Sequence, residues 1–158
     1  MATFLGRPEL VINYAPELDL RIAFASAQGY GEVALPEYRF EVECRLRHST
    51  GSFTYSVSNL CFDLESFARF SRELGGLQQG LRQDAALRNV GEMMILRLEG
   101  NSRKLQATLD VREYLAPSMA SLHAAFDVDY DLFVNKLRRE IDRFIEELRQ
   151  VEFFQGEK

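Results

Sequence analysis

Cysteine and histidine are scarce in this sequence, which limits the chemistry that it supports. Cys44 and Cys61 are the only cysteines, and His48 and His123 are the only histidines. Two cysteines make no disulfide framework, and Cys44 occupies an apolar strand position, so we expect a buried free thiol and no disulfide. No zinc-finger spacing relates the four residues. We predict no metal and no cofactor.

Long apolar runs, a leader segment and a basic excess are missing too. No run approaches the length of about 18 residues that suggests a membrane span, and Met1 to Arg7 lacks the basic and apolar regions of a signal peptide. The net charge of −5 argues against a phosphate-binding surface. We therefore expect a soluble, cytoplasmic protein that binds neither membranes nor nucleic acid and favours basic partners.

Motifs that carry catalysis are absent as well. The chain has no Gly-x-Ser-x-Gly elbow, no Walker loop and no His-Glu-x-x-His. Cys61 with a histidine is a conceivable nucleophilic pair, but its place between Leu60 and Phe62 is explained by packing. We predict no catalytic residue and a protein that is not an enzyme.

One motif resembles a calcium loop at its start. Asp127, Asp129 and Asp131 have the right spacing, but Leu132 replaces the turn glycine and Arg138 replaces the bidentate glutamate. Acidic residues are also favoured where a helix begins, because they accept hydrogen bonds from its free amides. The pattern therefore predicts capping rather than calcium binding.

The clearest structural signal is a hairpin between Tyr38 and Val57. Apolar and polar residues alternate from Tyr38 to Leu46 and again from Phe53 to Val57, which predicts two strands with one dry and one wet face. A four-residue loop that sets His48 opposite Phe53 brings the apolar faces together.

The remaining segments predict more strands and two helices in a single domain spanning 1–158, with irregular ends at about 1–7 and 153–158. Strands are expected at 9–14, 18–26 and 119–126, with a second hairpin that sets Leu98 opposite Leu105. We expect an α+β fold with one antiparallel sheet of about six or seven strands. One short helix and one long C-terminal helix pack on the same face of this sheet.

The first helix begins at Asp63, where Phe62 and Phe67 form a hydrophobic staple, and is expected to end at Gly75-Gly76. A polar connector is expected from 77 to 84. The last helix follows Asp131 and carries apolar residues at steps of three and four, a pattern shared with dimerising coils. We favour packing on the sheet.

If two helices cover one face of the sheet, the other face stays open. From the first hairpin it presents Arg39, Glu41, Glu43, Arg45 and Arg47, and from the second, if both join one sheet, Lys104, Gln106, Thr108 and Asp110. A rigid surface of mixed charge suits recognition of a protein partner. The five residues of the first hairpin are our candidate partner-binding site, with a merely solvated sheet face as the alternative.

The order of elements resembles a known family. A hairpin runs into a capped helix over Ser58-Asn59-Leu60-Cys61-Phe62-Asp63-Leu64-Glu65-Ser66-Phe67, a second hairpin follows, and Asp129-Tyr130-Asp131-Leu132-Phe133 starts a closing helix. This is similar to immunity-type proteins of bacterial polymorphic toxin systems, in particular those paired with wall-associated contact toxins, from about Glu37 to Val151. The resemblance implies a non-catalytic protein that occludes a toxin, and no site residues carry over.

Two other classes of function remain open from the sequence. One is a small-ligand-binding or enzymatic domain with a pocket between sheet and helices. The other is a structural homo-oligomer. The gene immediately upstream discriminates among them, since a large secreted toxin favours immunity and a metabolic operon favours the pocket.

Overall fold

The computed structural model describes residues 7–28, 37–90, 94–115 and 118–156. Its elements follow the chain in this order: β1 (Glu9–Ala15), β2 (Leu18–Gln28), β3 (Glu37–His48), β4 (Gly51–Phe62), α1 (Leu64–Gln78), β5 (Asp84–Arg88), β6 (Met94–Gly100), β7 (Leu105–Leu115), β8 (Ser118–Val128), the π-helix η1 (Asp131–Lys136) and α2 (Leu137–Gly156). The α+β class, with antiparallel strands and a long last helix, is confirmed.

The strands within the described ranges form two sheets, whereas the sequence predicted one sheet of about six or seven strands. Sheet A has the order β1-β2-β3-β4 and sheet B the order β5-β6-β7-β8. The chain passes from one sheet to the other through α1, which follows β4 and packs against β5. Side-chain alternation defines the faces of each strand but not its neighbours, so the division into two sheets was not foreseen.

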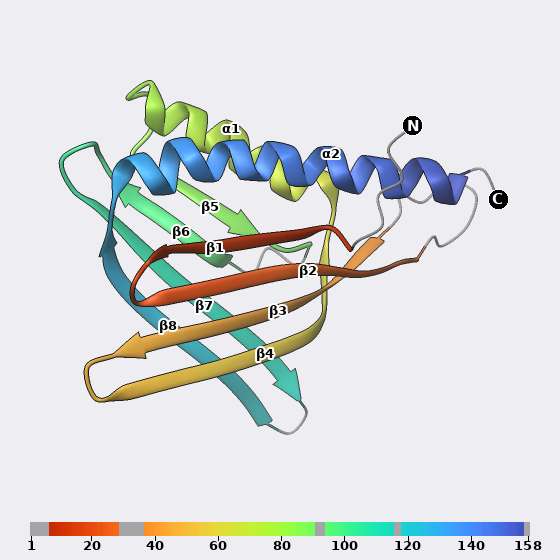
Figure 1. Cartoon of the computed structure of the whole chain (residues 1–158), viewed down its shortest axis with the longest axis horizontal. Helices are drawn as coiled ribbons and strands as arrows, with labels where there is room; N and C mark the ends of the chain where they lie inside the picture. The colour runs from red at the N-terminus through yellow and green to blue at the C-terminus, as the bar shows by residue number, and fades with distance from the viewer. Residues whose placement is uncertain (1–6, 29–36, 91–93, 116–117, 157–158) are drawn as a thin grey trace.

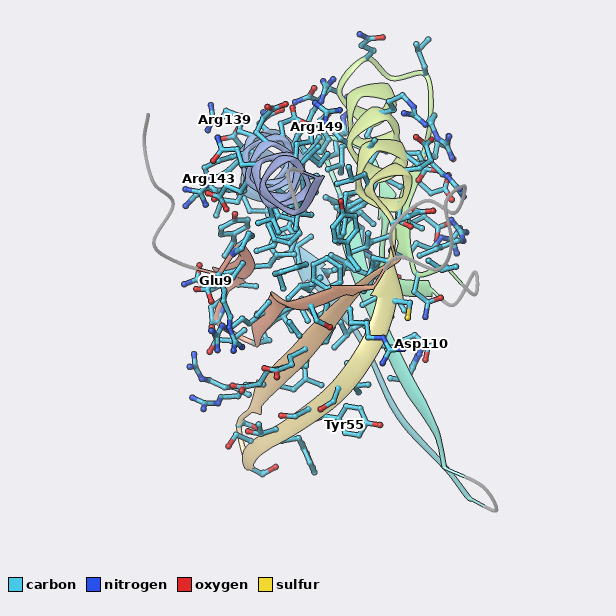
Figure 2. All side chains as sticks on the ribbon, turned by 90° about the vertical axis from the view of Figure 1, so that its right-hand side faces the viewer. Glu9, Tyr55, Asp110, Arg139, Arg143 and Arg149 are labelled. Carbon is cyan, nitrogen blue, oxygen red and sulfur yellow. The ribbon has the colours of Figure 1, made fainter. Side chains whose placement is uncertain are left out.

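The two helices lie side by side along one side of both sheets (Figures 1 and 2). α2 packs against β1, the edge strand of sheet A, and α1 packs against β5, the edge strand of sheet B. The helices also contact each other. They therefore bridge the two sheets rather than cover one face of a single sheet, as the sequence had suggested.

Aromatic side chains from sheet A and from both helices meet in one core. The ring of Phe40 on β3 lies 5.5 Å from that of Phe67 on α1 and 6.0 Å from that of Phe144 on α2, measured between centroids. Phe67 and Phe144 are 5.1 Å apart in an edge-to-face arrangement, which is favourable for aromatic pairs. The buried apolar cluster continues into sheet B through Leu87 and Leu109.

The β3–β4 hairpin has a tighter loop than predicted. His48 pairs with Gly51 rather than with Phe53, so the loop has two residues. A shift of two residues leaves every side chain on its predicted face, because side chains alternate with a period of two. The second hairpin is shifted likewise, with Leu98 opposite Ala107.

A bulge interrupts the same hairpin further from its loop. Val42 pairs with Val57, but Phe40 pairs with Leu60, so β4 carries one residue more than β3. Beyond the bulge the inward positions of β4 change from odd to even numbers, which brings Phe62 into the core. The three-residue step between the apolar Val57 and Leu60 is the sequence sign of this bulge.

The start of α1 agrees with the prediction. The Asp63 carboxylate accepts hydrogen bonds from the backbone amide and the hydroxyl of Ser66, each at 2.7 Å. The rings of Phe62 and Phe67 stack with centroids 5.1 Å apart, as expected of a hydrophobic staple.

The predicted end of α1 at Gly75-Gly76 is wrong, because the helix continues to Gln78. The glycine with the left-handed conformation is Gly80, whose φ is 72°. Its amide donates to the carbonyl of Leu77 at 3.2 Å, and the amide of Leu81 donates to that of Gly76 at 2.9 Å. These two bonds form a Schellman motif, which ends the helix one turn later than the glycine pair suggested.

A buried carboxylate on α1 accepts a hydrogen bond from the edge strand of sheet B. Glu73 has only 8% of its surface exposed, and its Oε2 accepts a hydrogen bond of 2.8 Å from the backbone amide of Ala86 on β5. Its Oε1 lies 3.4 Å from the guanidinium of Arg82. A buried amide without an acceptor is costly, so Glu73 ties α1 to β5.

One residue of the acidic run, Asp129, caps the last helix as predicted. Asp129 accepts a hydrogen bond of 3.0 Å from the amide of Leu132, and the hydroxyl of Tyr130 donates to the carbonyl of Leu77 at 3.1 Å. The apolar stripe that follows is buried within the chain, from Phe133 to Leu148. This agrees with intramolecular packing of the helix.

Phe67→Ala is expected to lower the free energy of unfolding by about 3 to 5 kcal/mol, because it leaves a cavity at the junction of both helices and sheet A. Urea denaturation monitored by circular dichroism measures the loss. Leu81→Ala, at a residue with 76% of its surface exposed, serves as control and is expected to change stability by less than about 0.5 kcal/mol. Equal effects of the two substitutions would contradict the core described here.

Glu73→Ala is expected to cost about 1 to 3 kcal/mol, because the amide of Ala86 loses its acceptor. Glu73→Gln retains an acceptor oxygen and should cost less. Glu65→Ala on the exposed side of α1 is the control, expected below about 1 kcal/mol. Denaturant titration gives the three values, and hydrogen exchange at Ala86 should accelerate in Glu73→Ala alone.

Candidate protein-binding surface

The five residues predicted to bind a partner lie on one face of β3. Alternate residues of β3 are buried, and those between them point to the opposite side of sheet A, which we call the outer face. The outer face carries Glu41, Glu43, Arg45 and Arg47, all exposed, and the half-buried Arg39. The sequence prediction of this face is therefore confirmed by the pattern of burial; whether it binds a partner stays a prediction.

Neighbouring strands add to the outer face through their register. Arg21 on β2 lies opposite Glu43, and Ser56 on β4 lies opposite the same residue on its other side. Asp19 and Thr54 flank Arg45 in the same way. Charged and hydroxyl side chains thus run across three adjacent strands, where the backbone hydrogen bonds of the sheet hold them in place.

Two arginines of this face form ion pairs with carboxylates. Arg21 Nη2 lies 2.6 Å from Glu9 Oε2, and Arg47 Nη2 lies 2.6 Å from Asp19 Oδ2. All four side chains are substantially exposed, so each pair contributes little to stability. The pairs instead keep the two guanidinium groups next to Glu9 and Asp19.

Glu41 and Glu43 have no such partners. Neither carboxylate forms an ion pair or a hydrogen bond with any part of the chain that the structure describes, and the same holds for the guanidinium of Arg45. The two carboxylates stand two residues apart on one strand, exposed and pointing in the same direction. Their negative charge is therefore available to a partner.

A shallow hollow of about 100 Å³ lies between these carboxylates and β4. The bulge places Ser58 beside it, and Arg21 closes the opposite side; its lining is Arg21, Ala23, Glu41, Val42, Glu43, Ser56, Val57 and Ser58. Sequence alternation alone did not predict the hollow, since it depends on the extra residue in β4.

Arg39 differs from the other four predicted residues. It lies on the far side of the bulge, opposite Cys61, and its Nε is enclosed without a hydrogen-bond acceptor among the described residues. An enclosed donor without an acceptor is unfavourable. Arg39 therefore belongs to the margin of the outer face rather than to its exposed centre.

The second hairpin does not extend this face, contrary to the prediction that depended on a single sheet. Lys104 precedes β7, and Gln106, Thr108 and Asp110 lie on β7, all with sheet B. Asp110 is also buried rather than exposed. The separation follows from the passage of the chain through α1 to a second sheet.

A second charged cluster lies where α2 packs on β1. Arg143 forms an ion pair with Glu140 and lies 3.9 Å from Glu147, while Glu9 of β1 adds a further negative charge (Figure 2). Burial raises the pKa of Glu147 above its usual value; Arg143 lowers it, and Glu140 and Glu9 raise it further. Helical spacing indicated the pairs within α2 but not their proximity to β1.

Neither cysteine forms a disulfide, and Cys44 is buried as predicted. Burial, assisted by the negative charge of Asp19, raises the pKa of the Cys44 thiol to about 12. The thiol is therefore protonated at neutral pH and acts as a small apolar side chain.

In the described ranges, no three side chains of histidine, cysteine, aspartate or glutamate converge as a metal site would require. No helix in these ranges has both the length and the apolarity needed to cross a membrane. Comparisons of the chain with protein families, with curated proteins and with solved structures found no match.

Glu147→Gln tests the charged cluster on α2. A carboxyl whose pKa is raised in the folded state favours folding while it is protonated, and this contribution is lost as the pH rises through the folded pKa. The substitution is therefore expected to raise the melting temperature at pH 7.5 and to have no effect well below the ordinary glutamate pKa.

The control is Glu146→Gln, next in the chain but with 65% of its side chain exposed. It should leave the melting temperature unchanged within error at pH 7.5. A lower melting temperature for Glu147→Gln at pH 7.5 would show instead that the ion pair with Arg143 dominates.

Proposed function

We propose that this chain is a non-catalytic binding protein, an immunity-like protein that occludes a partner toxin in the cytoplasm. The observation that carries the proposal is the pair of exposed carboxylates, Glu41 and Glu43, without intramolecular partners at the centre of a rigid, uncovered sheet face. The surface of the partner that contacts these two carboxylates is basic.

The energetics of association support this choice of surface. A carboxylate that is already paired must lose its partner before it binds another cation, whereas Glu41 and Glu43 bind without this loss. β3 is an interior strand of sheet A, so the backbone that carries both carboxylates is already fixed, and binding has to order only the two side chains. Charge complementarity also steers encounter with a basic partner, in agreement with the net charge of −5.

The order of elements supports the toxin as the class of partner. A hairpin, a capped helix, a second hairpin and a long closing helix occur in that sequence in this chain, as in the immunity-type proteins that it resembles. The cytoplasmic address belongs to the proposal, and a reducing compartment is consistent with Cys44 and Cys61 not forming a disulfide.

The small-ligand alternative receives less support from the described hollows. The hollow on the outer face, about 100 Å³, is smaller than the 300 Å³ or so at which ligand pockets begin. A larger groove of about 480 Å³ lies between the end of α1 and the start of the closing helix. Ligand pockets are mostly apolar, but this groove is lined by Gln78, Asp131, Asn135, Arg138, Arg139 and Asp142.

Glu41→Lys combined with Glu43→Lys is expected to abolish binding of the partner, which the proposal expects to be a toxin domain encoded immediately upstream. The charge reversal places cations where the partner's cations bind, while exposed substitutions typically change stability by less than about 0.5 kcal/mol. Calorimetry with the purified toxin domain measures affinity, and survival of cells that express the toxin measures protection.

The control reverses two carboxylates elsewhere on the surface, Asp127→Lys with Glu146→Lys, both exposed. It changes the net charge equally and should retain binding and protection. If the control loses binding as fully as the test variant, only net charge matters. If the test variant folds and binds with unchanged affinity, the outer face is not the binding surface, and a wild-type chain that neither binds nor protects overturns the proposed function.

A further inference from the structure

The groove of about 480 Å³ between the end of α1 and the first turns of the closing helix has the size of a small-molecule site, for which about 300 to 1,000 Å³ is usual. Arg139, one of its residues, lies on the side of α2 that faces away from the strands (Figure 2). Asn135, Arg138 and Asp142 recur at steps of three and four, which places them in one row along the helix. Gln78 of α1 lines the groove with them.

The guanidinium of Arg138 is held in place by α1. Its Nη1 donates a hydrogen bond of 2.6 Å to Gln78 Oε1, and the Gln78 amide donates to Asn135 Oδ1 at 2.5 Å. A Cβ atom at Gly75 would lie 2.9 Å from Cζ, 2.9 Å from Nη1 and 3.0 Å from Nη2 of Arg138, so the plane of this group faces the backbone of α1. The guanidinium is therefore ordered before a ligand arrives, which lowers the entropic cost of binding.

Gly75 is explained by this contact and not by the end of the helix. It has no capping role, because α1 continues past it to Gln78. Glycine inside a helix is less favourable than alanine, since it loses more conformational freedom on folding. Only a residue without a side chain lets Arg138 lie against α1, so Gly75 keeps the guanidinium in the groove although it weakens the helix.

The two arginines of the groove have no carboxylate partners. Neither Arg138 nor Arg139 forms an ion pair in the part of the chain that the structure describes, although Asp142 follows both within about one helical turn. A guanidinium presents its N–H groups as a planar fork that matches a carboxylate or a phosphate. The groove therefore offers an oxyanion two cations that no carboxylate of the described chain engages.

The two aspartates of the groove determine which oxyanion fits. Asp131 Oδ1 accepts a hydrogen bond of 2.5 Å from Asn135, and Asp142 Oδ1 accepts one of 2.6 Å from Ser71. The other oxygen of each carboxylate remains to accept a hydrogen bond from a ligand. Their negative charges balance the two arginines, so a phosphate group, with about −1.5 to −2 charges near pH 7, is repelled more strongly than a carboxylate with one.

We propose that this groove binds a small amino acid, a ligand that carries both a carboxylate and a protonated amino group. The carboxylate lies on Arg138 and Arg139, and the amino group donates to Asp142, one turn further along the helix. The polar lining suits a ligand with little apolar surface. This site is independent of the protein-binding surface, because it is built from the helices and uses neither Glu41 nor Glu43.

Titration of the full chain with L-glutamine and with L-alanine, followed through the amide NMR signals, tests the proposal. Saturable shifts are expected at Gln78 and Asn135. Acetate lacks the amino group and inorganic phosphate carries more negative charge, so both are expected to bind more weakly than either amino acid. The absence of a saturable shift with both amino acids overturns the proposal, and so does inorganic phosphate or acetate that binds as tightly as they do.

Gly75→Ala separates the binding role of Arg138 from a structural one. Alanine favours the helix but takes the place of the guanidinium, so the melting temperature should be kept or raised while binding weakens by about tenfold or more, as loss of a charge-assisted hydrogen bond typically brings. Gly76→Ala is the matched control, because its Cβ would lie 2.8 Å from Cδ of Arg82 instead. It should leave binding unchanged.

Arg138→Gln gives a second measurement that does not depend on the glycine. It should weaken binding as strongly as Gly75→Ala, whereas Arg149→Gln removes the same charge from an exposed position of the same helix and should retain binding. Should Gly75→Ala fail to fold, the comparison of these two arginine variants decides. Binding that Arg138→Gln leaves intact, or that Arg149→Gln reduces equally, overturns the assignment of the site.

Discussion

The contact among Phe40, Phe67 and Phe144 is the interaction on which the rest of the structure depends. Sheet A, α1 and α2 touch one another at this point, where each of the three rings lies within 6.0 Å of the other two. Because α1 and α2 are held there, each can cover the edge strand beside it, β5 and β1 respectively. The outer face of sheet A is left uncovered as a result, since both helices are already engaged on the other side of the strands.

Several parts of this arrangement are encoded by local patterns and were predictable from the sequence. The alternation along β3 requires only that neighbouring side chains point to opposite faces, so it correctly separated Glu41 and Glu43 from Val42 and Cys44. The Asp63 cap and the Phe62 staple are equally local, because their partners Ser66 and Phe67 follow within three to five residues.

The features that the sequence did not predict depend on contacts between distant segments, or on register shifts that leave the alternation of side chains unchanged. A register shift of two residues leaves the alternation intact, so the sequence cannot distinguish His48 opposite Gly51 from His48 opposite Phe53. The assignment of strands to two sheets, and the approach of Glu9 to the α2 cluster, arise from tertiary packing. The hollow beside Glu41 required the bulge, whose only sign is the spacing from Val57 to Leu60.

The hydrogen bond between Glu73 and Ala86 makes the packing of α1 and the placement of β5 depend on each other. The carboxylate is buried only when β5 is in place to donate its amide, and the outer edge of β5 is sheltered only when α1 has docked. Either element alone leaves a polar group without its partner, so the helix and the strand gain stability together. Loss of the contact between α1 and β5 therefore exposes one polar group on each element, so the two elements stabilise each other.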